Sequence, residues 1–177
     1  MILPKIRDKR LITLRRGGTL SDADHRLLAI WAAECAQHVL HFFEEVRPDD
    51  PRPRQAVEAA HAWVRGEIAM KQARGAAGAS QDAARDVRER SEAARLAALS
   101  AGQAAAVAHV AAHELGAAAY AIRAVMAASS EDTKELFRQW ECQWQRERLP
   151  DRIRDLVLDD QRLRNDICWH IFSEECE

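Results

Sequence analysis

An alanine-rich stretch over residues 101–121 constrains the fold of this chain more than any other feature. It reads AGQAAAVAHVAAHELGAAAYA, and its only side chains with polar character are Gln103, His109, His113, Glu114 and Tyr120. No face of a helix with this sequence is polar enough to lie on water. We therefore expect a central helix wrapped by other helices, which supply partners for its buried polar groups.

Composition favours helices throughout the chain. The 177 residues are 47% hydrophobic and 31% charged, as in an ordinary soluble domain. Alanine makes up about a fifth of the chain and aromatic residues only 6%, a balance that favours helix over strand. We expect an all-α fold, a compact single-domain bundle of about six helices around a central alanine-rich helix. An irregular N-terminal arm over residues 1–20 precedes this helical domain, which spans residues 21–177.

Capping residues and apolar spacing predict where the helices lie. The expected ranges are 22–46, 53–66, 68–88, 91–128 with a possible interruption near Gly102, 133–148, and 150 onward. The fifth helix carries Leu136, Phe137, Trp140 and Trp144 at helical spacing. The apolar face of the sixth consists of Ile153, Leu156, Val157, Leu163, Ile167, Cys168 and Ile171.

Charge and cysteine usage narrow the possible partners and compartments. A formal net charge of -2 predicts no attraction to nucleic acid or to a membrane, and the basic segment over residues 5–16 favours a solvated arm. The start of the chain, with an early proline and charges, is unlike a signal peptide. The four cysteines lack CxxC spacing, so we expect reduced core thiols and a cytoplasmic protein.

Three charged side chains fall where apolar ones are expected. Glu114 and Asp160 each lie inside the apolar arc of their own helix, and Arg164 follows Asp160 by one turn. The pattern predicts a buried ionic network. We favour a structural role for it over a functional pocket, because a buried ion pair can stabilise one arrangement of helices without binding a ligand.

Histidines give a second set of candidates. Glu34, His38, His41 and Glu45 follow one margin of the first helix, and His109 and His113 lie one turn apart on the central helix. The favoured interpretation is hydrogen-bonded histidines in a buried polar network that includes Glu34 and His38. The alternative is a metal site of His109, His113, Glu34 and His38, although the HExxH glutamate is missing. No catalytic motif is evident, and no cofactor is predicted.

Four stretches of the chain are similar to a known family. They are TLRRGGTLSDADHRLLAIWAAECAQHVL, RPRQAVEAAHAWVRGEI, AVAHVAAHELGAAAYAIRAV and WQRERLPDRIRDLVLDDQRLRNDICW. These resemble bacterial immunity proteins of the immunity-five-like family. The resemblance implies an all-helical cytosolic protein that binds and neutralises a cognate toxin, and it supplies no catalytic residues.

The leading hypothesis is therefore a non-enzymatic immunity protein whose partner is a cognate protein toxin, with the oligomeric state left open. Such interfaces favour tryptophan and arginine anchors, and the candidates are Arg15, Arg16, Trp63, Trp140 and Arg148. The alternative is a helical metal- or small-molecule-binding protein, possibly a hydrolase, with a His/Glu site in the bundle core. A nucleic-acid-binding role for the basic arm ranks last.

Overall fold

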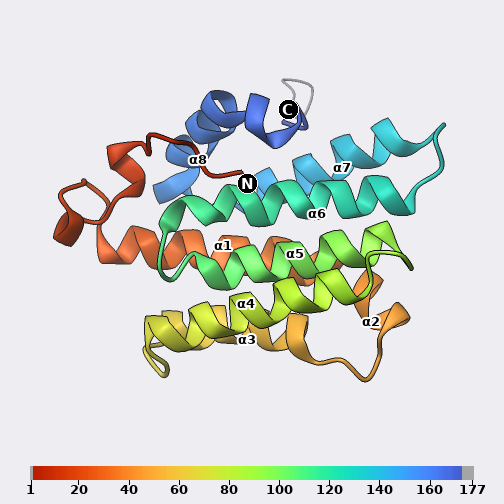
Figure 1. Cartoon of the computed structure of the whole chain (residues 1–177). Coiled ribbons are helices and arrows are strands. Elements are labelled where there is room, and N and C mark those ends of the chain that lie inside the picture. Colours follow the sequence, from red (N-terminus) through yellow and green to blue (C-terminus); the bar gives the residue numbers. More distant parts are fainter. Residues whose placement is uncertain (1, 173–177) are drawn as a thin grey trace.

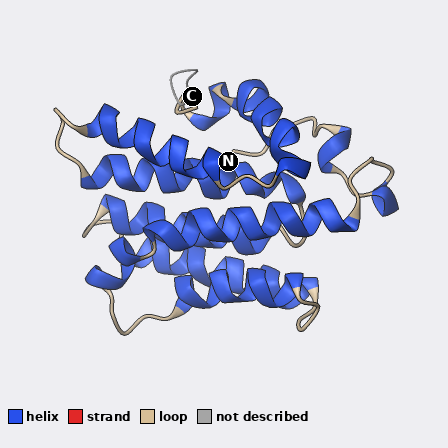
Figure 2. Ribbon diagram, turned by 180° about the vertical axis from the view of Figure 1, so that it is seen from behind, coloured by secondary structure: helices blue, strands red, loops and turns tan. Residues whose placement is uncertain are grey.

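The computed structural model describes residues 2–172, and the regular elements in that range are helical (Figures 1 and 2). The α-helices are α1 (Asp22–Val39), α2 (His41–Val46), α3 (Arg52–Val64), α4 (Met70–Asp86), α5 (Glu92–Ala106), α6 (Glu114–Ala128), α7 (Lys134–Glu147) and α8 (Asp151–Arg164). Short 3-10 turns lie at Lys9–Leu11, Leu14–Arg16, Ala111–His113 and Asp166–Cys168. The all-α prediction is confirmed. Whether residues 21–177 form a single domain stays a prediction.

The alanine-rich centre is a pair of antiparallel helices, so the expectation of one helix over residues 91–128 is wrong. Helices α5 and α6 lie side by side in the middle of the bundle (Figure 1), and residues 107–113 reverse the chain between them. Helices α3 and α4 pack on the α5 side, α7 on the α6 side, and α1 against both α5 and α6. An unbroken helix of that length would extend about 57 Å, well beyond a domain of this size.

The turn between α5 and α6 is stabilised by side chains that are distant in sequence. His25 Nε2 lies 2.7 Å from the carbonyl oxygen of Val107, and Arg16 Nη1 donates to the carbonyl of His109 at 3.3 Å. Backbone carbonyls that leave a helix need such partners when they are buried. These two contacts supply partners for carbonyl oxygens of the turn, in a segment whose residues favour a helix.

Two glycines allow the central helices to approach their neighbours closely. Gly102, where an interruption was considered, lies inside α5, and a Cβ there would come within 3.1 Å of the Ala77 carbonyl oxygen in α4. A Cβ at Gly116 would lie 2.5 Å from Gln103 Oε1. A Cβ at Gly102 would thus press on a backbone oxygen, whereas a Cβ at Gly116 would displace the end of the Gln103 side chain; neither glycine breaks its helix.

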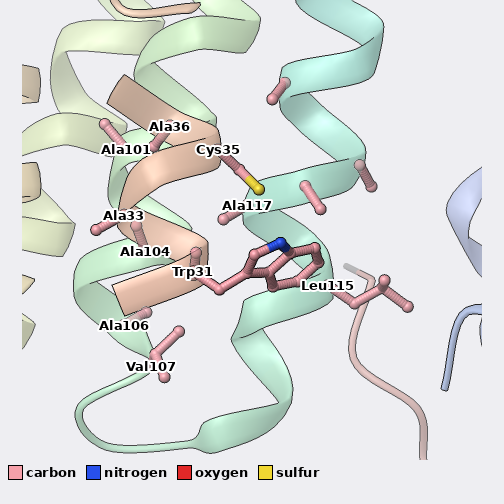
Figure 3. Close-up of a cluster of buried hydrophobic side chains, with 14 of the residues drawn as sticks. Trp31, Ala33, Cys35, Ala36, Ala101, Ala104, Ala106, Val107, Leu115 and Ala117 are labelled. Carbon is pink, nitrogen blue, oxygen red and sulfur yellow. The ribbon is translucent and has the colours of Figure 1, made fainter. Parts of the chain in front are cut away.

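Trp31 is the largest fully buried side chain and joins three helices. Its ring extends from α1 toward α6, beside Leu115 and Ala117 (Figure 3). Its indole N–H donates to the carbonyl oxygen of Gln145 in α7 at 2.8 Å. Elsewhere the centre is filled mainly by alanine, including Ala36 of α1 and Ala101 of α5 (Figure 3).

Helix α7 buries a face that is mainly polar and leaves three large apolar side chains exposed. Its buried residues are Arg138, Glu141, Cys142 and Gln145, which recur at the spacing of one helix face. Leu136, Phe137 and Trp140 are 44%, 36% and 55% exposed. The apolar spacing correctly predicted a helix, but the apolar face is not the buried one.

The C-terminal part departs from expectation in two further ways. Helix α8 ends at Arg164, and Leu163 and Ile167 of its expected apolar face are exposed. Cys142 is disulfide-bonded, which corrects the expectation of reduced thiols throughout. Cys35 and Cys168 are free and buried, whereas Cys176 lies outside the described residues.

Over residues 2–172, no helix combines the length and the apolar character that a membrane span requires.

Candidate functional site

Arg164 lies at the centre of a buried ionic network. Its Nε donates to Asp160 Oδ1 at 2.8 Å, and its Nη2 donates to Glu114 Oε1 at 3.0 Å. Its Nη1 donates to the backbone carbonyls of Ala112 at 2.9 Å and Ile2 at 3.3 Å. One guanidinium therefore links α8, the start of α6 and the N-terminal segment.

The electrostatics of this network favour a structural role. Glu114, Asp160 and Arg164 are all buried, and Glu114 Oε2 has no hydrogen-bond partner among the described residues. Burial raises the pKa of Glu114 well above its usual range; Arg164 lowers it, and Asp160 raises it further. Glu114, Asp160 and Arg164 thus lie in the interior, where their contacts link α6 to α8.

His113 and His109 lie at the turn between α5 and α6 rather than along one helix. His113 Nδ1 is 2.7 Å from Gln103 Oε1, and the two histidine rings are 5.0 Å apart. Burial, with smaller effects from His109, Arg164 and Arg7, lowers the pKa of His113 to about 4. Burial also lowers the pKa of His109, whose Nδ1 is buried without a partner among residues 2–172. Both rings are therefore neutral at pH 7.

The lowered pKa of His113 predicts a loss of stability on acidification. Below pH 6.5 the unfolded chain takes up a proton at this position, whereas the folded protein does so only near pH 4. The free energy of unfolding should therefore fall by about 2–3 kcal/mol between these pH values. In His113→Gln, whose amide can still donate to Gln103, this part of the pH dependence should disappear.

The measurement is urea denaturation of the wild type and the variant at intervals from pH 7 to pH 4. Glu114 acts in the opposite direction, because its raised pKa adds stability as the pH falls. The effect of His113 is therefore obtained by subtracting the free energy of unfolding of His113→Gln from that of the wild type at each pH. The exposed His41→Gln variant should keep the wild-type pH profile; an identical profile for His113→Gln would contradict the assignment.

Glu34 and His38 do not join the two histidines of the turn. His38 Nδ1 lies 2.8 Å from Glu141 Oε2, and its ring stacks on Trp144 at 3.7 Å between centroids. Arg148 lies over the same Trp144 ring at 3.8 Å. Within residues 2–172, no group of three or more His, Cys, Asp or Glu side chains could hold a metal. The alternative set of metal ligands is therefore not brought together.

A cavity of about 460 Å³ lies where the N-terminal arm meets the turn between α5 and α6. We call it the arm cavity. Its lining consists of Arg7, Leu11, Ile12, Thr13, Arg15, Arg16, His25, Trp63, Met70, Ala108, His109, Val110 and Ala111. Three of the predicted partner-binding residues, Arg15, Arg16 and Trp63, thus line one cavity. The other two, Trp140 and Arg148, lie at α7.

Comparison with known proteins identifies the family. The family model described as "Imm-5 like putative immunity protein" matches residues 18–152, which include α1 to α7. The chain belongs to this immunity protein family. Membership indicates a protein partner and agrees with the resemblance found in the sequence. No curated protein and no solved structure matches the chain.

The immunity-family match leaves parts of both candidate sites outside its range. Arg7, Arg15 and Arg16 precede residue 18, and Asp160 and Arg164 follow residue 152. Sequence reasoning missed the cavity itself and the roles of Arg7 and His25 in it. The basic run over residues 5–16 was visible, but it gave no sign that the arm folds back onto the bundle.

Proposed function

We propose that this immunity protein binds a cognate toxin through the exposed face of α7 and neutralises it by covering part of the toxin's surface. Family membership supports the class of partner. The single observation that carries the choice of surface is the reversed orientation of α7, with polar residues buried and aromatic residues exposed. The cytoplasmic location predicted from the sequence is part of this proposal.

The exposed apolar residues of α7 lie at helical spacing, beside exposed polar residues such as Glu135 and Gln143. We define the α7 surface as Leu136, Phe137, Trp140 and the half-buried Trp144. The Phe137 and Trp140 rings meet edge to face, with centroids 5.3 Å apart. Tryptophan is the residue type that most often dominates binding energy when a partner covers it. A contiguous apolar surface of this kind marks a protein contact more often than chance exposure does.

The buried side of α7 holds the helix in this orientation. Glu141 accepts hydrogen bonds from His38 of α1 at 2.8 Å and from Gln145 at 2.9 Å. Gln145 Nε2 also donates to the Ala118 carbonyl of α6 at 3.2 Å. Rotating α7 to bury its aromatic rings would expose or break these bonds, so the α7 surface stays available to a partner.

Co-expression with the toxin encoded beside this gene tests the proposal. The wild-type chain should restore growth, whereas Trp140→Ala should weaken toxin binding at least tenfold, about 1.4 kcal/mol or more, and reduce protection. Leu163→Ala is the matched control, because Leu163 is an apolar residue 69% exposed on α8, away from α7. It should protect as the wild type does.

Two results would contradict the proposal. Toxicity unchanged by the wild-type chain, with every toxin candidate encoded nearby, would remove the immunity function. Full protection by Trp140→Ala and Phe137→Ala would show that the toxin binds elsewhere. Light scattering of the purified protein adds a further check, since a wild-type dimer that Trp140→Ala dissociates would assign the α7 surface to self-association.

A further inference from the structure

We propose that the arm cavity is a binding site for a small phosphate ester, that is, a phosphate group joined to a flat or apolar body. This site is separate from the α7 surface, and its argument does not depend on toxin binding. The cavity volume of about 460 Å³ is within the range of small-molecule sites.

The charge of the lining points to an anion. Arg7, Arg15 and Arg16 all line the cavity, and no acidic side chain does so among the described residues. Arg15 is partly neutralised by Asp22 at 3.0 Å. Arg16 donates to the carbonyl of His109, and Arg7 has no acidic partner within residues 2–172. The wall of the cavity therefore keeps an excess of positive charge.

The surroundings of the histidines agree with this charge. After burial, which has the largest effect, Arg74 and Arg16 lower the pKa of His109. Burial likewise has the largest effect on the pKa of His25 and lowers it; the hydrogen bond to Val107 and the charge of Asp22 oppose this, and Arg15 and Arg16 add smaller effects that lower it. Two cationic side chains, Arg74 and Arg16, thus lie near enough to His109 to affect its protonation.

Phosphate fits this set of donors better than a single carboxylate does. Guanidinium groups bind phosphate oxygens in pairs through parallel N–H bonds. Arg7 and Arg16, with Arg15 partly neutralised by Asp22, can balance the two negative charges of a phosphate monoester, whereas a carboxylate carries one.

The apolar part of the lining favours a ligand that carries an apolar body as well as a phosphate group. Leu11, Val110 and Met70 supply apolar walls, and the half-buried Trp63 supplies an aromatic ring. The His25 ring packs against Trp63 at 4.9 Å between centroids, with a tilt of 59°. Inorganic phosphate would leave these apolar groups in water. A ligand with a flat body beside its phosphate would cover them.

Four separate segments build the cavity, all at the left end of the bundle in Figure 1. They are the arm, the start of α1 through His25, the end of α3 through Trp63 with Met70 of α4, and the turn between α5 and α6. A smaller cavity of about 250 Å³ lies beside it; the two share Arg15, His25, Trp63 and Met70, and Asp22 lines the smaller one.

Calorimetric titration of the purified full chain with adenosine monophosphate, adenosine and inorganic phosphate tests the site. Adenosine monophosphate should bind at physiological ionic strength, and adenosine and inorganic phosphate should each bind at least about tenfold more weakly. Arg16→Gln and Arg7→Gln should each weaken the nucleotide at least about fivefold. Arg90→Gln is the matched control, because Arg90 is exposed and does not line the cavity.

Several results of the titrations would contradict the proposed site. Absence of nucleotide binding, or binding that the Arg7 and Arg16 variants leave unchanged, would overturn the site. Equal binding of inorganic phosphate and nucleotide would overturn the requirement for an apolar body, as would unchanged nucleotide affinity in Trp63→Leu. Binding of an oligoglutamate peptide in place of the nucleotide would assign the cavity to an acidic protein segment and would also contradict the proposal. Circular dichroism of each variant establishes that it is folded.

Discussion

Arg164→Met should lower the free energy of unfolding by about 3–5 kcal/mol. The substitution keeps the length of the side chain but removes the only guanidinium that bonds both Glu114 and Asp160 within residues 2–172. It leaves two buried carboxyl groups without a counter-charge and two backbone carbonyls, at Ala112 and Ile2, without a donor. Urea denaturation at pH 7, followed by tryptophan fluorescence, measures the loss.

Two variants show whether the loss of stability arises because Glu114 and Asp160 are buried without a counter-charge. Arg162→Met, on the exposed side of the same helix, should leave the unfolding midpoint almost unchanged. Adding Glu114→Gln and Asp160→Asn to Arg164→Met should recover part of the stability, because neutral amides are less costly to bury than unpaired carboxylates. A loss below about 1 kcal/mol for Arg164→Met alone would show that the network does not hold the helices together.

Trp31→Ala should be destabilising to a similar extent, by about 3–5 kcal/mol. The substitution empties the fully buried space between α1 and α6 and leaves the Gln145 carbonyl without its indole donor. Neighbouring alanines, such as Ala117 (Figure 3), are too short to fill the cavity.

Trp140→Ala is the natural comparison, since both changes remove an indole. Trp140 is 55% exposed, and its loss should change the free energy of unfolding by less than about 0.5 kcal/mol. Urea denaturation of the two variants at the same pH gives the difference directly. Equal losses of unfolding free energy for Trp31→Ala and Trp140→Ala would mean that Trp140 is as buried as Trp31. Helix α7 would then have to be rotated from its orientation in this structure.

The all-α architecture was predictable because helix signals are local. Ser21 and Ser91 accept hydrogen bonds from the backbone N–H groups of Asp24 and Ala94, as their positions in the sequence suggested. Proline and glycine placed the ends of α3 near their observed positions. The break after Ala106 could not be predicted in this way. It depends on His25 and Arg16, which lie far away in the sequence.

The orientation of α7 also could not be predicted from local sequence patterns. Periodicity shows that Leu136, Phe137 and Trp140 share a face, but it does not say which face the bundle covers. The polar face is buried because Glu141 meets His38 and Gln145 meets Ala118, partners supplied by other helices. The charged residues Glu114, Asp160 and Arg164 stood out locally, since charges inside an apolar arc are visible in the sequence alone. Their mutual contacts required the fold.

The close packing of α4 and α5 limits which residues the interior can accept. A Cβ at Gly102 would lie 3.1 Å from the backbone oxygen of Ala77, so a larger residue there requires the two helices to shift. The outward side of α7 has no such restriction, because its side chains end in solvent. Substitutions on the exposed side of α7 should therefore cost less stability than enlargement of Gly102.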